Sequence, residues 1–218
     1  MSAPQPAAPA GGPADGAGLT ASAPVTSSGA PPREPAAHVR RAVVSDADAV
    51  SDLAVLTFPM ACPPGTSPED VAQFCRDNLS PAHFAEYLRS PDHTVLLAER
   101  VDGGDGERVP ATPLAYALLC WGEIDPEVAG TIANPTVLLS KCYTHPSSHG
   151  SGMSSALMEA VLAAARSRGV RTVWLGVNQA NVRAQRFYAK HGFTVVGTKH
   201  MQVGSGRHDD FVMALRVG

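Results

Sequence analysis

Hydrophobic and polar positions follow two different periods along the chain, and these periods predict a mixed α/β domain. Two-residue alternation and β-branched runs predict strands, whereas apolar residues three and four positions apart predict helices. The predicted strands cover residues 39–44, 93–101, 114–122, 136–144, 170–177, 193–203 and 210–217. Three helices are predicted between the first two strands, and two more over 153–168 and 181–191. The order is β-α-α-α-β-β-β-α-β-α-β-β, with a βαβ unit that begins at residue 136.

Polar residues at the expected positions mark where the helices begin and end. Ser45 with Asp48 offers a capping box for the first helix. Ser67 and Ser80 are each followed by proline, the pattern of an N-cap with proline at the first helical position. Gly169 stands where a glycine is expected after the end of a helix.

The composition divides the chain into two parts. Residues 1–37 contain 11 Ala, 8 Pro and 5 Gly, and such a segment cannot bury enough apolar surface to offset the entropy of ordering it. We therefore expect residues 1–37 to be a disordered tail. Residues 38–218 are long enough for one domain with a full core.

Charge and cysteine content exclude several classes of protein. The net charge is −3 and no block of basic residues appears, which argues against nucleic acid as a partner. No apolar run approaches the ~20 residues that span a bilayer, and the N-terminus lacks the pattern of a signal peptide. The four cysteines form no CxxC pair, so we expect reduced thiols in a cytoplasmic protein with no membrane association.

Common catalytic and metal-binding motifs are also missing from the sequence. It contains neither a GxSxG elbow nor a GxxxxGK[ST] loop. His145 and His149 have an i, i+4 spacing but flank a proline in a Ser/Gly-rich loop, so we expect no metal site there.

The loop before the helix at 153–168 is the first candidate for ligand binding. It reads His149-Gly150-Ser151-Gly152-Met153-Ser154. Its glycines let the backbone approach a ligand, and the first N–H groups of the helix lack partners within the helix. This geometry suits a phosphate or pyrophosphate. The alternative is a turn of small residues that only closes a connection.

A second motif follows the next strand and gives the loop its context. Residues 181–193 read N-x-x-A-x-x-F-Y-x-K-x-G-F. This spacing resembles the closing motif of the GNAT N-acyltransferase superfamily, and the loop resembles the pyrophosphate loop of the same family. The resemblance extends over about residues 38–217. It implies a mixed, mostly antiparallel central sheet flanked by helices, with a βαβ unit that binds the cofactor.

The resemblance also implies a co-substrate, acetyl-CoA, and the residues that hold it. The loop residues 149–154 would bind the pyrophosphate, the backbone around Cys142, Tyr143 and Thr144 would orient the pantetheine arm, and Asn181 would both cap its helix and contact the cofactor. The sequence departs from the family at His149, usually Arg or Gln, and at Ser154, usually Gly or Ala. It also lacks the Glu that many relatives carry near Leu138 or Leu139 as a general base.

Acetyl transfer to an amine by direct attack needs a neutral amine and a proton donor for the departing thiolate. The motif makes Tyr188 that donor, with packing on the sheet as the alternative. No Ser or Cys nucleophile is needed, so Cys142 is interpreted as a buried strand residue. Tyr143 fits the core or the substrate pocket. Asp209 and Asp210 either attract a cationic substrate or belong to a solvated face.

Within the superfamily the pattern is most similar to the spermidine/spermine-type and related small-amine N-acetyltransferases. Phe58 after the first helix and the strand end Leu175-Gly176-Val177 carry this narrower resemblance. The predicted function is acetyl transfer from acetyl-CoA to a primary amine of a small molecule. The alternative is a catalytically impaired GNAT-like domain that binds acyl-CoA or a protein. The resemblance also allows a homodimer.

The predicted tail yields a direct test by truncation. Because its composition does not support a core, removing residues 1–37 is expected to leave both the melting temperature and the acetyl-CoA affinity unchanged. Differential scanning calorimetry and isothermal titration calorimetry measure the two quantities. A fall of several degrees would mean that the segment packs on the domain.

Overall fold

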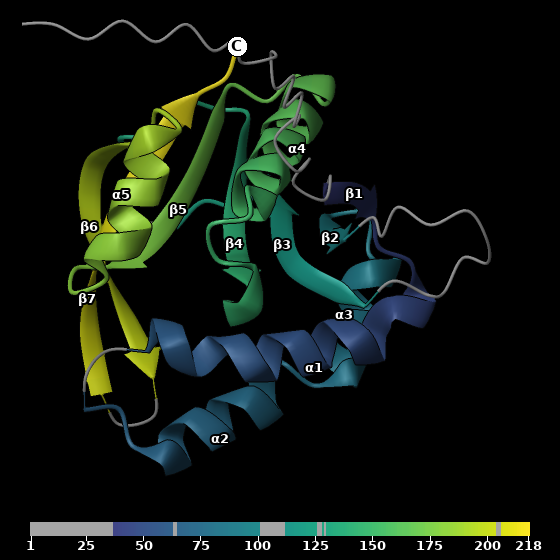
Figure 1. Cartoon of the computed structure of the whole chain (residues 1–218). Helices are drawn as coiled ribbons and strands as arrows, with labels where there is room; N and C mark the ends of the chain where they lie inside the picture. The colour runs from purple at the N-terminus through teal and green to yellow at the C-terminus, as the bar shows by residue number, and fades with distance from the viewer. Residues whose placement is uncertain (1–36, 63–64, 101–111, 126–127, 129, 204–205) are drawn as a thin grey trace, which may run out of the picture. The chain divides into compact units, whose positions relative to one another are not determined.

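The computed structural model describes residues 37–62, 65–100, 112–125, 128, 130–203 and 206–218. These residues form a seven-stranded sheet with helices on both faces (Figure 1). The strand order is β1-β2-β3-β4-β5-β7-β6, and β4 and β5 form a parallel pair while the other neighbouring strands described run antiparallel. The predicted mixed, mostly antiparallel sheet with a βαβ unit is confirmed.

The elements follow the predicted order, with short 3-10 turns added. The strands are β1 Ala37–Arg41, β2 His93–Arg100, β3 Pro113–Trp121, β4 Thr136–Thr144, β5 Thr172–Asn178, β6 Thr194–Val203 and β7 Gly206–Arg216. The helices are α1 Ala47–Thr57, α2 Pro68–Asn78, α3 Pro81–Arg89, α4 Met153–Ser167 and α5 Val182–Lys190, and the 3-10 turns are η1 Val44–Asp46, η2 Phe58–Ala61 and η3 Pro146–Ser148. Ala37, which the sequence assigned to the tail, is already the first residue of β1, and residues 1–36 lie outside the described part.

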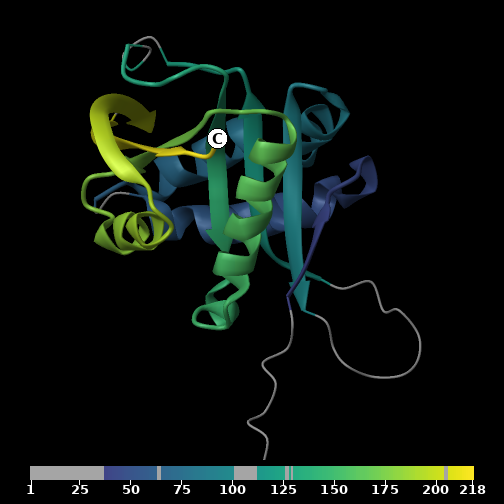
Figure 2. The ribbon, with the colours of Figure 1, turned by 90° about the horizontal axis from the view of Figure 1, so that it is seen from above.

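The helices divide between the two faces of the sheet. Figure 2 shows α4 in front of the strands, with α1 and α3 behind them. Each face has its own core. Trp174, Tyr116 and Phe84 are buried on the α1–α3 face, and Leu157, Met158 and Leu175 on the α4 face. The buried Trp174 Nε1 donates to the Glu123 carbonyl at 3.0 Å, so its polar atom is satisfied.

Of the three helix starts predicted at serines, two are confirmed and one is wrong. Ser67 accepts the Asp70 N–H at 3.0 Å, and Ser80 caps α3 in the same way. The Ser45–Asp48 capping box does not form, because α1 begins at Ala47 after the 3-10 turn η1. The carboxylate of Asp46 instead accepts the Val43 N–H at 2.7 Å, a bond that closes the η1 turn.

Arg40 ties this turn to the sheet. Its guanidinium contacts both oxygens of Asp46, at 2.7 and 2.9 Å, and Glu99 Oε1 on β2 at 2.7 Å. These side chains are largely buried, so the ion pairs are less screened than pairs at the surface. The hydrogen bonds from Arg40 hold the pKa of Asp46 below its usual value.

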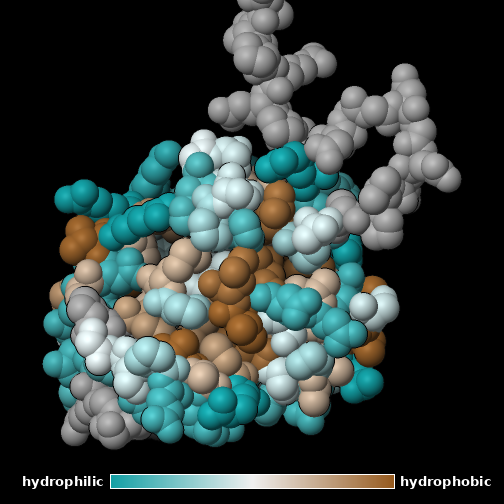
Figure 3. All heavy atoms as spheres, turned by 60° about the horizontal axis from the view of Figure 1, so that its bottom comes forward, coloured by the Kyte–Doolittle hydropathy of each residue, from teal (hydrophilic) through white to brown (hydrophobic). Residues whose placement is uncertain are grey.

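The face that presents α1 and α2 gathers apolar side chains near its centre (Figure 3). Val55 and Leu56 of α1 and Met60 of η2 are all at least two-fifths exposed. No helix in the described residues is both long enough and apolar enough to cross a membrane.

Replacing Arg40 by Met is expected to lower the free energy of unfolding by about 2 kcal/mol, between the values for surface and fully buried ion pairs.

The ion pair of Asp46 also predicts a dependence of stability on pH. Because folding lowers the pKa of Asp46, its contribution to the free energy of unfolding is present above the pKa of the unfolded chain and is lost as the pH falls through the pKa of the folded state. The melting temperatures of parent and Asp46→Asn should therefore begin to converge as the pH falls below about 4, and should meet below the lowered pKa of the folded state. Arg41→Met, an exposed neighbour on β1, is the matched control and should behave like the parent.

Candidate active site

The divergence of β4 from β5 opens a cleft in the sheet. The two strands pair only from Thr136 and Thr172 to Leu138 and Trp174, although both continue further. Figure 1 shows them side by side at one end and apart at the other. The cleft has a volume of about 280 Å³. Its walls include residues from the α1 face, such as Phe58, and from the α4–α5 face.

A β-bulge on β4 stands at the middle of this opening. Leu118 pairs with Lys141 and Leu119 with Leu139, so Ser140 is the extra residue on β4. Ser140 is exposed and lines the cleft. Beyond Leu138 the described part of β4 bonds to β3 alone, and its other edge faces the cleft. That edge offers backbone N–H and C=O groups to an extended ligand.

The Gly-rich loop and the start of α4 close one end of the cleft. Gly150 and Gly152 have φ values of 85° and 78°, which favour glycine, and Gly152 is the residue before α4. Thr144 Oγ1 and Ser154 Oγ are 2.8 Å apart, so the end of β4 is joined to the first turn of α4. Ser154 stands where the GNAT pattern usually has Gly or Ala, and its hydroxyl is hydrogen-bonded to Thr144.

The two histidines of the loop have different surroundings. The Nδ1 atom of His145 accepts the Ser147 N–H at 3.1 Å, which caps η3. His149 is exposed and lines the cleft. Among the described residues no group of three His, Cys, Asp or Glu side chains is arranged to hold a metal ion.

Helix α5 supplies the wall opposite the bulge. Asn181 Oδ1 accepts the Ala184 N–H at 3.0 Å and thereby caps α5, and Asn181 also lines the cleft. Tyr188 is 9% exposed and packs against Phe187 and Phe193. Burial raises the pKa of Tyr188 well above its ordinary value, so its hydroxyl carries a proton throughout the neutral range.

Seven of the predicted site residues line one cleft. They are Cys142, Tyr143, Thr144, His149, Ser154, Asn181 and Tyr188. Gly150, Ser151 and Gly152 are not lining residues but stand in the chain between His149 and Ser154. The side chain of Met153 is buried in the core on the α4 face, which leaves only its backbone for a ligand.

Neither Cys142 nor Tyr143 is ionised at neutral pH. Burial raises the pKa of Cys142 to about 12, so its sulfur is a thiol and a poor nucleophile. Tyr143 stacks on the buried Tyr116 with ring centroids 5.7 Å apart, and burial raises its pKa as well. Tyr143 therefore belongs both to the core and to the cleft wall.

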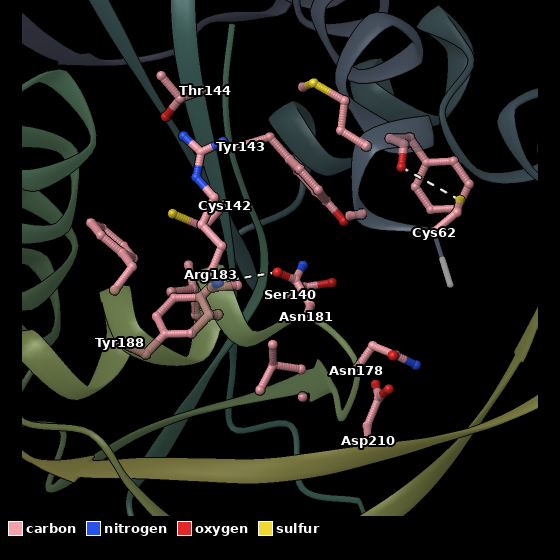
Figure 4. Close-up of a pocket in the computed structure, with 18 of the residues that line it drawn as sticks. Cys62, Ser140, Cys142, Tyr143, Thr144, Asn178, Asn181, Arg183, Tyr188 and Asp210 are labelled. Carbon is pink, nitrogen blue, oxygen red and sulfur yellow. Dashed lines mark hydrogen bonds between the residues drawn. The ribbon is translucent and has the colours of Figure 1, made fainter. Parts of the chain in front are cut away.

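The two adjacent aspartates of β7 face different surroundings. Asp210 is 4% exposed and lines the cleft together with Asn178 of β5, its partner in the sheet (Figure 4). Burial raises the pKa of Asp210. Asp209 is exposed, and its carboxylate lies 2.8 Å from His200 Nδ1. Of the two, Asp210 alone lines the cleft.

Sequence reasoning missed several residues of the cleft. Ser140 is exposed there only because of the bulge, and the pattern of the strand does not reveal a bulge. Asn178 was missed because it meets Asp210, which the sequence had offered for a cationic substrate, only through the pairing of β5 with the distant strand β7. Arg183 lies within the 181–193 motif, and its positive charge beside the cleft was the signal that could have found it.

Comparison with known sequences gives one family. The model of the acetyltransferase (GNAT) family matches residues 66–193. An uncharacterised N-acetyltransferase of Mycobacterium tuberculosis (strain H37Rv) is 44% identical over 170 residues, which cover 78% of this chain and 97% of that protein. An uncharacterised N-acetyltransferase of Mycobacterium bovis matches equally well.

Solved structures share the fold at low sequence identity. The PaiA N-acetyltransferase of Thermoplasma acidophilum, in complex with coenzyme A, has a TM-score of 0.63 at 20% identity, with 83% of this chain and 99% of that chain covered. The ribosomal-protein-S18-alanine N-acetyltransferase of Escherichia coli has a TM-score of 0.58 at 18% identity, with 84% and 95% covered.

Replacing Gly152 by Asp tests the predicted role of the loop. A carboxylate at the start of α4 would repel a pyrophosphate, so acetyl-CoA binding, measured by titration calorimetry, is expected to be lost. The positive φ adds about 1 kcal/mol of strain, which a folded domain tolerates.

Gly169→Asp is the matched control. Gly169 follows the other end of α4, also has a positive φ, and has open space where a Cβ would lie. The Gly169→Asp variant introduces the same charge and similar strain away from the cleft, so its affinity for acetyl-CoA should equal that of the parent. Equal affinity in both variants would remove the loop from the binding site.

Proposed function

The chain belongs to the acetyltransferase (GNAT) family, and we propose that it transfers an acetyl group from acetyl-CoA to the primary amine of a small molecule by direct attack. One observation carries the proposal. The cleft between β4 and β5 is lined by Ser154 in the first turn of α4, by Tyr188 and by the buried carboxylate of Asp210. Figure 4 shows Thr144, the partner of Ser154, and Asp210 on opposite sides of it. A cofactor with phosphates and an amine suit these two ends respectively.

The cofactor end has the features that a CoA thioester requires. The free N–H groups of the first turn of α4 and the helix dipole favour the pyrophosphate. His149 and Arg183 add donors beside it. The unpaired edge of β4 from Ser140 to Thr144 can bond the amide groups of the pantetheine arm, which brings the thioester to the bulge. The solved relative from Thermoplasma acidophilum binds coenzyme A, which supports this assignment.

Tyr188 is proposed to protonate the departing thiolate. It lines the cleft on the same side of the sheet as Cys142, on the β4 edge assigned to the pantetheine arm. Because burial raises its pKa, the phenol stays protonated and ready to donate at every pH where the amine reaction would be measured. Loss of activity through its ionisation is expected only above about pH 10.

A second candidate is a domain that binds acyl-CoA without turnover. The observation that favours it is the apolar β4, where Leu138 and Leu139 stand near the position of the acid in many relatives. A thiol-release assay with acetyl-CoA and a panel of primary amines separates the two. Amine-dependent release supports the transferase, whereas tight acetyl-CoA binding without release supports the binding module.

The variant Tyr188→Phe tests the proton donor. Since charge builds on sulfur only in the transition state, kcat and kcat/KM for the amine should fall together by about 10²-fold or more. Acetyl-CoA affinity should change little, because the ring still packs against Phe187 and Phe193.

Tyr87→Phe serves as the control for this variant. Tyr87 is a partly buried tyrosine of α3 that does not line the cleft, and its pKa is also raised by burial. Removal of the Tyr87 hydroxyl should leave kcat and kcat/KM for the amine unchanged. If Tyr188→Phe turns over like the parent, Tyr188 is a packing residue.

A further inference from the structure

We propose that Asp210 binds the amino group of the acceptor and takes a proton from it, and that the acceptor is a monoamine whose amine is carried on an apolar body. This inference rests on the proposed function and names its acceptor class. It follows from the position of Asp210, from the side chains that orient it, and from the composition of the walls around it.

Asp210 reaches the cleft because two strands leave room for it. It pairs with Asn178 on β5 and with Lys199 on β6. Gly176 of β5 lies beneath: a Cβ there would meet Lys199 Cε at 2.8 Å and Asp210 Oδ2 at 3.2 Å. The missing side chain at Gly176 therefore gives space to both charged groups on this face of the sheet.

Neighbouring groups orient the carboxylate of Asp210. Asn178 Oδ1 accepts the Ala180 N–H at 2.9 Å, which fixes the amide so that its NH₂ group is left to donate to Asp210. Lys199 is paired with Asp125, 3.4 Å from its Oδ2, and its positive charge also acts on Asp210. The hydrogen bond from Asn178 therefore orients the carboxylate of Asp210, which is 4% exposed.

The walls around Asp210 are mainly apolar. The lining residues of the α1–η2 side and the adjacent β6 strand are Phe58, Met60, Ala61, Cys62 and Met201. Phe58 is fixed by stacking on Phe74, with ring centroids 4.3 Å apart. Among the described lining residues Asp210 is the one with a carboxylate, whereas Arg183, His149 and His208 have basic side chains.

This composition matches one ammonium group but not several. A polyamine or diamine would carry a second cation into a wall of Phe and Met side chains, where burying an unpaired charge is costly. An alkyl or arylalkyl monoamine leaves only apolar atoms in the same place, and their burial is favourable.

Asp210 and Tyr188 together account for every proton that is transferred in the reaction. The acceptor enters as an ammonium ion and gives one proton to the Asp210 carboxylate, which later releases it to water. The neutral nitrogen forms the N–C bond, and the C–S bond breaks. Tyr188 protonates the leaving sulfur and regains a proton from the nitrogen, so the products are the amide, the free thiol and one proton.

A matched pair of amines tests the acceptor class. Hexylamine and 1,5-diaminopentane have the same length when their terminal groups are counted. The far end is a methyl group in hexylamine and a second ammonium group in the diamine. In the thiol-release assay with acetyl-CoA, kcat/KM for hexylamine is expected to exceed that for the diamine by at least about tenfold. A preference for the diamine or for spermidine, or turnover of an alanyl peptide alone, overturns the acceptor class.

Asp210→Asn tests the residue, with Asp209→Asn as its neighbour control. Asp210→Asn should lower kcat/KM for hexylamine by about 10²-fold. Its acetyl-CoA affinity should remain that of the parent, which also reports that the variant is folded. Asp209→Asn should match the parent in both. Parent-like turnover by Asp210→Asn overturns the role of Asp210 alone, whereas no thiol release with any amine overturns the proposed function and this inference together.

A variant at the apolar wall gives a second test that does not depend on the buried aspartate. Met201 is 37% exposed and lies on β6 two residues beyond Lys199. Met201→Glu would add a second carboxylate to the wall, so the preference for hexylamine over 1,5-diaminopentane should shrink by about tenfold. An unchanged ratio would mean that the chain of the amine does not lie along this wall.

Discussion

The separation of β4 from β5 is the constraint on which the rest of the molecule depends. A parallel pair normally continues to bond along its length, but here the pairing ends at Leu138 and Trp174. The bulge at Ser140 turns the remainder of β4 toward β3. Unbonded strand edges inside a domain are unfavourable unless a partner completes them. In the proposed function the pantetheine arm would be that partner and would replace the water that bonds to this edge in the free protein.

An opening within the sheet, rather than a pocket on one face, would let the two proposed substrates meet. Cys142 and Tyr188 belong to the core of the α4 face, whereas Tyr143 and Phe58 belong to the core of the α1–α3 face. The same cleft is lined by both sets. In the proposed reaction a phosphate-bearing cofactor would approach from the start of α4, and the amine from the side of η2.

Local signals predicted the elements because they are set by near neighbours. Ser67, Ser80 and Asn181 cap their helices through bonds three residues away. Ser45 misled because the decisive contact of η1 is between Asp46 and Arg40 on a different element. The cleft could be predicted only in part for the same reason. Its loop and closing motif are each contiguous in sequence. The place of Asp210 in the cleft depends on the pairing of β7 with β5, and the exposure of Ser140 depends on the register between β3 and β4.

The absence of an acid on β4 has a structural counterpart across the cleft. Leu139 lines the wall where many relatives carry an acid nearby, which leaves that side apolar. Because β7 pairs with β5 up to Asn178, the side chain of Asp210 reaches the same opening from the opposite strand. A proton acceptor need only lie close to the nitrogen it serves, and the strand that carries it is immaterial. Moving the carboxylate from β4 to β7 places it on the α1 side, away from the phosphates. In the proposed reaction the ammonium ion would therefore meet this carboxylate at a distance from Arg183 and His149, which we assign to the cofactor end.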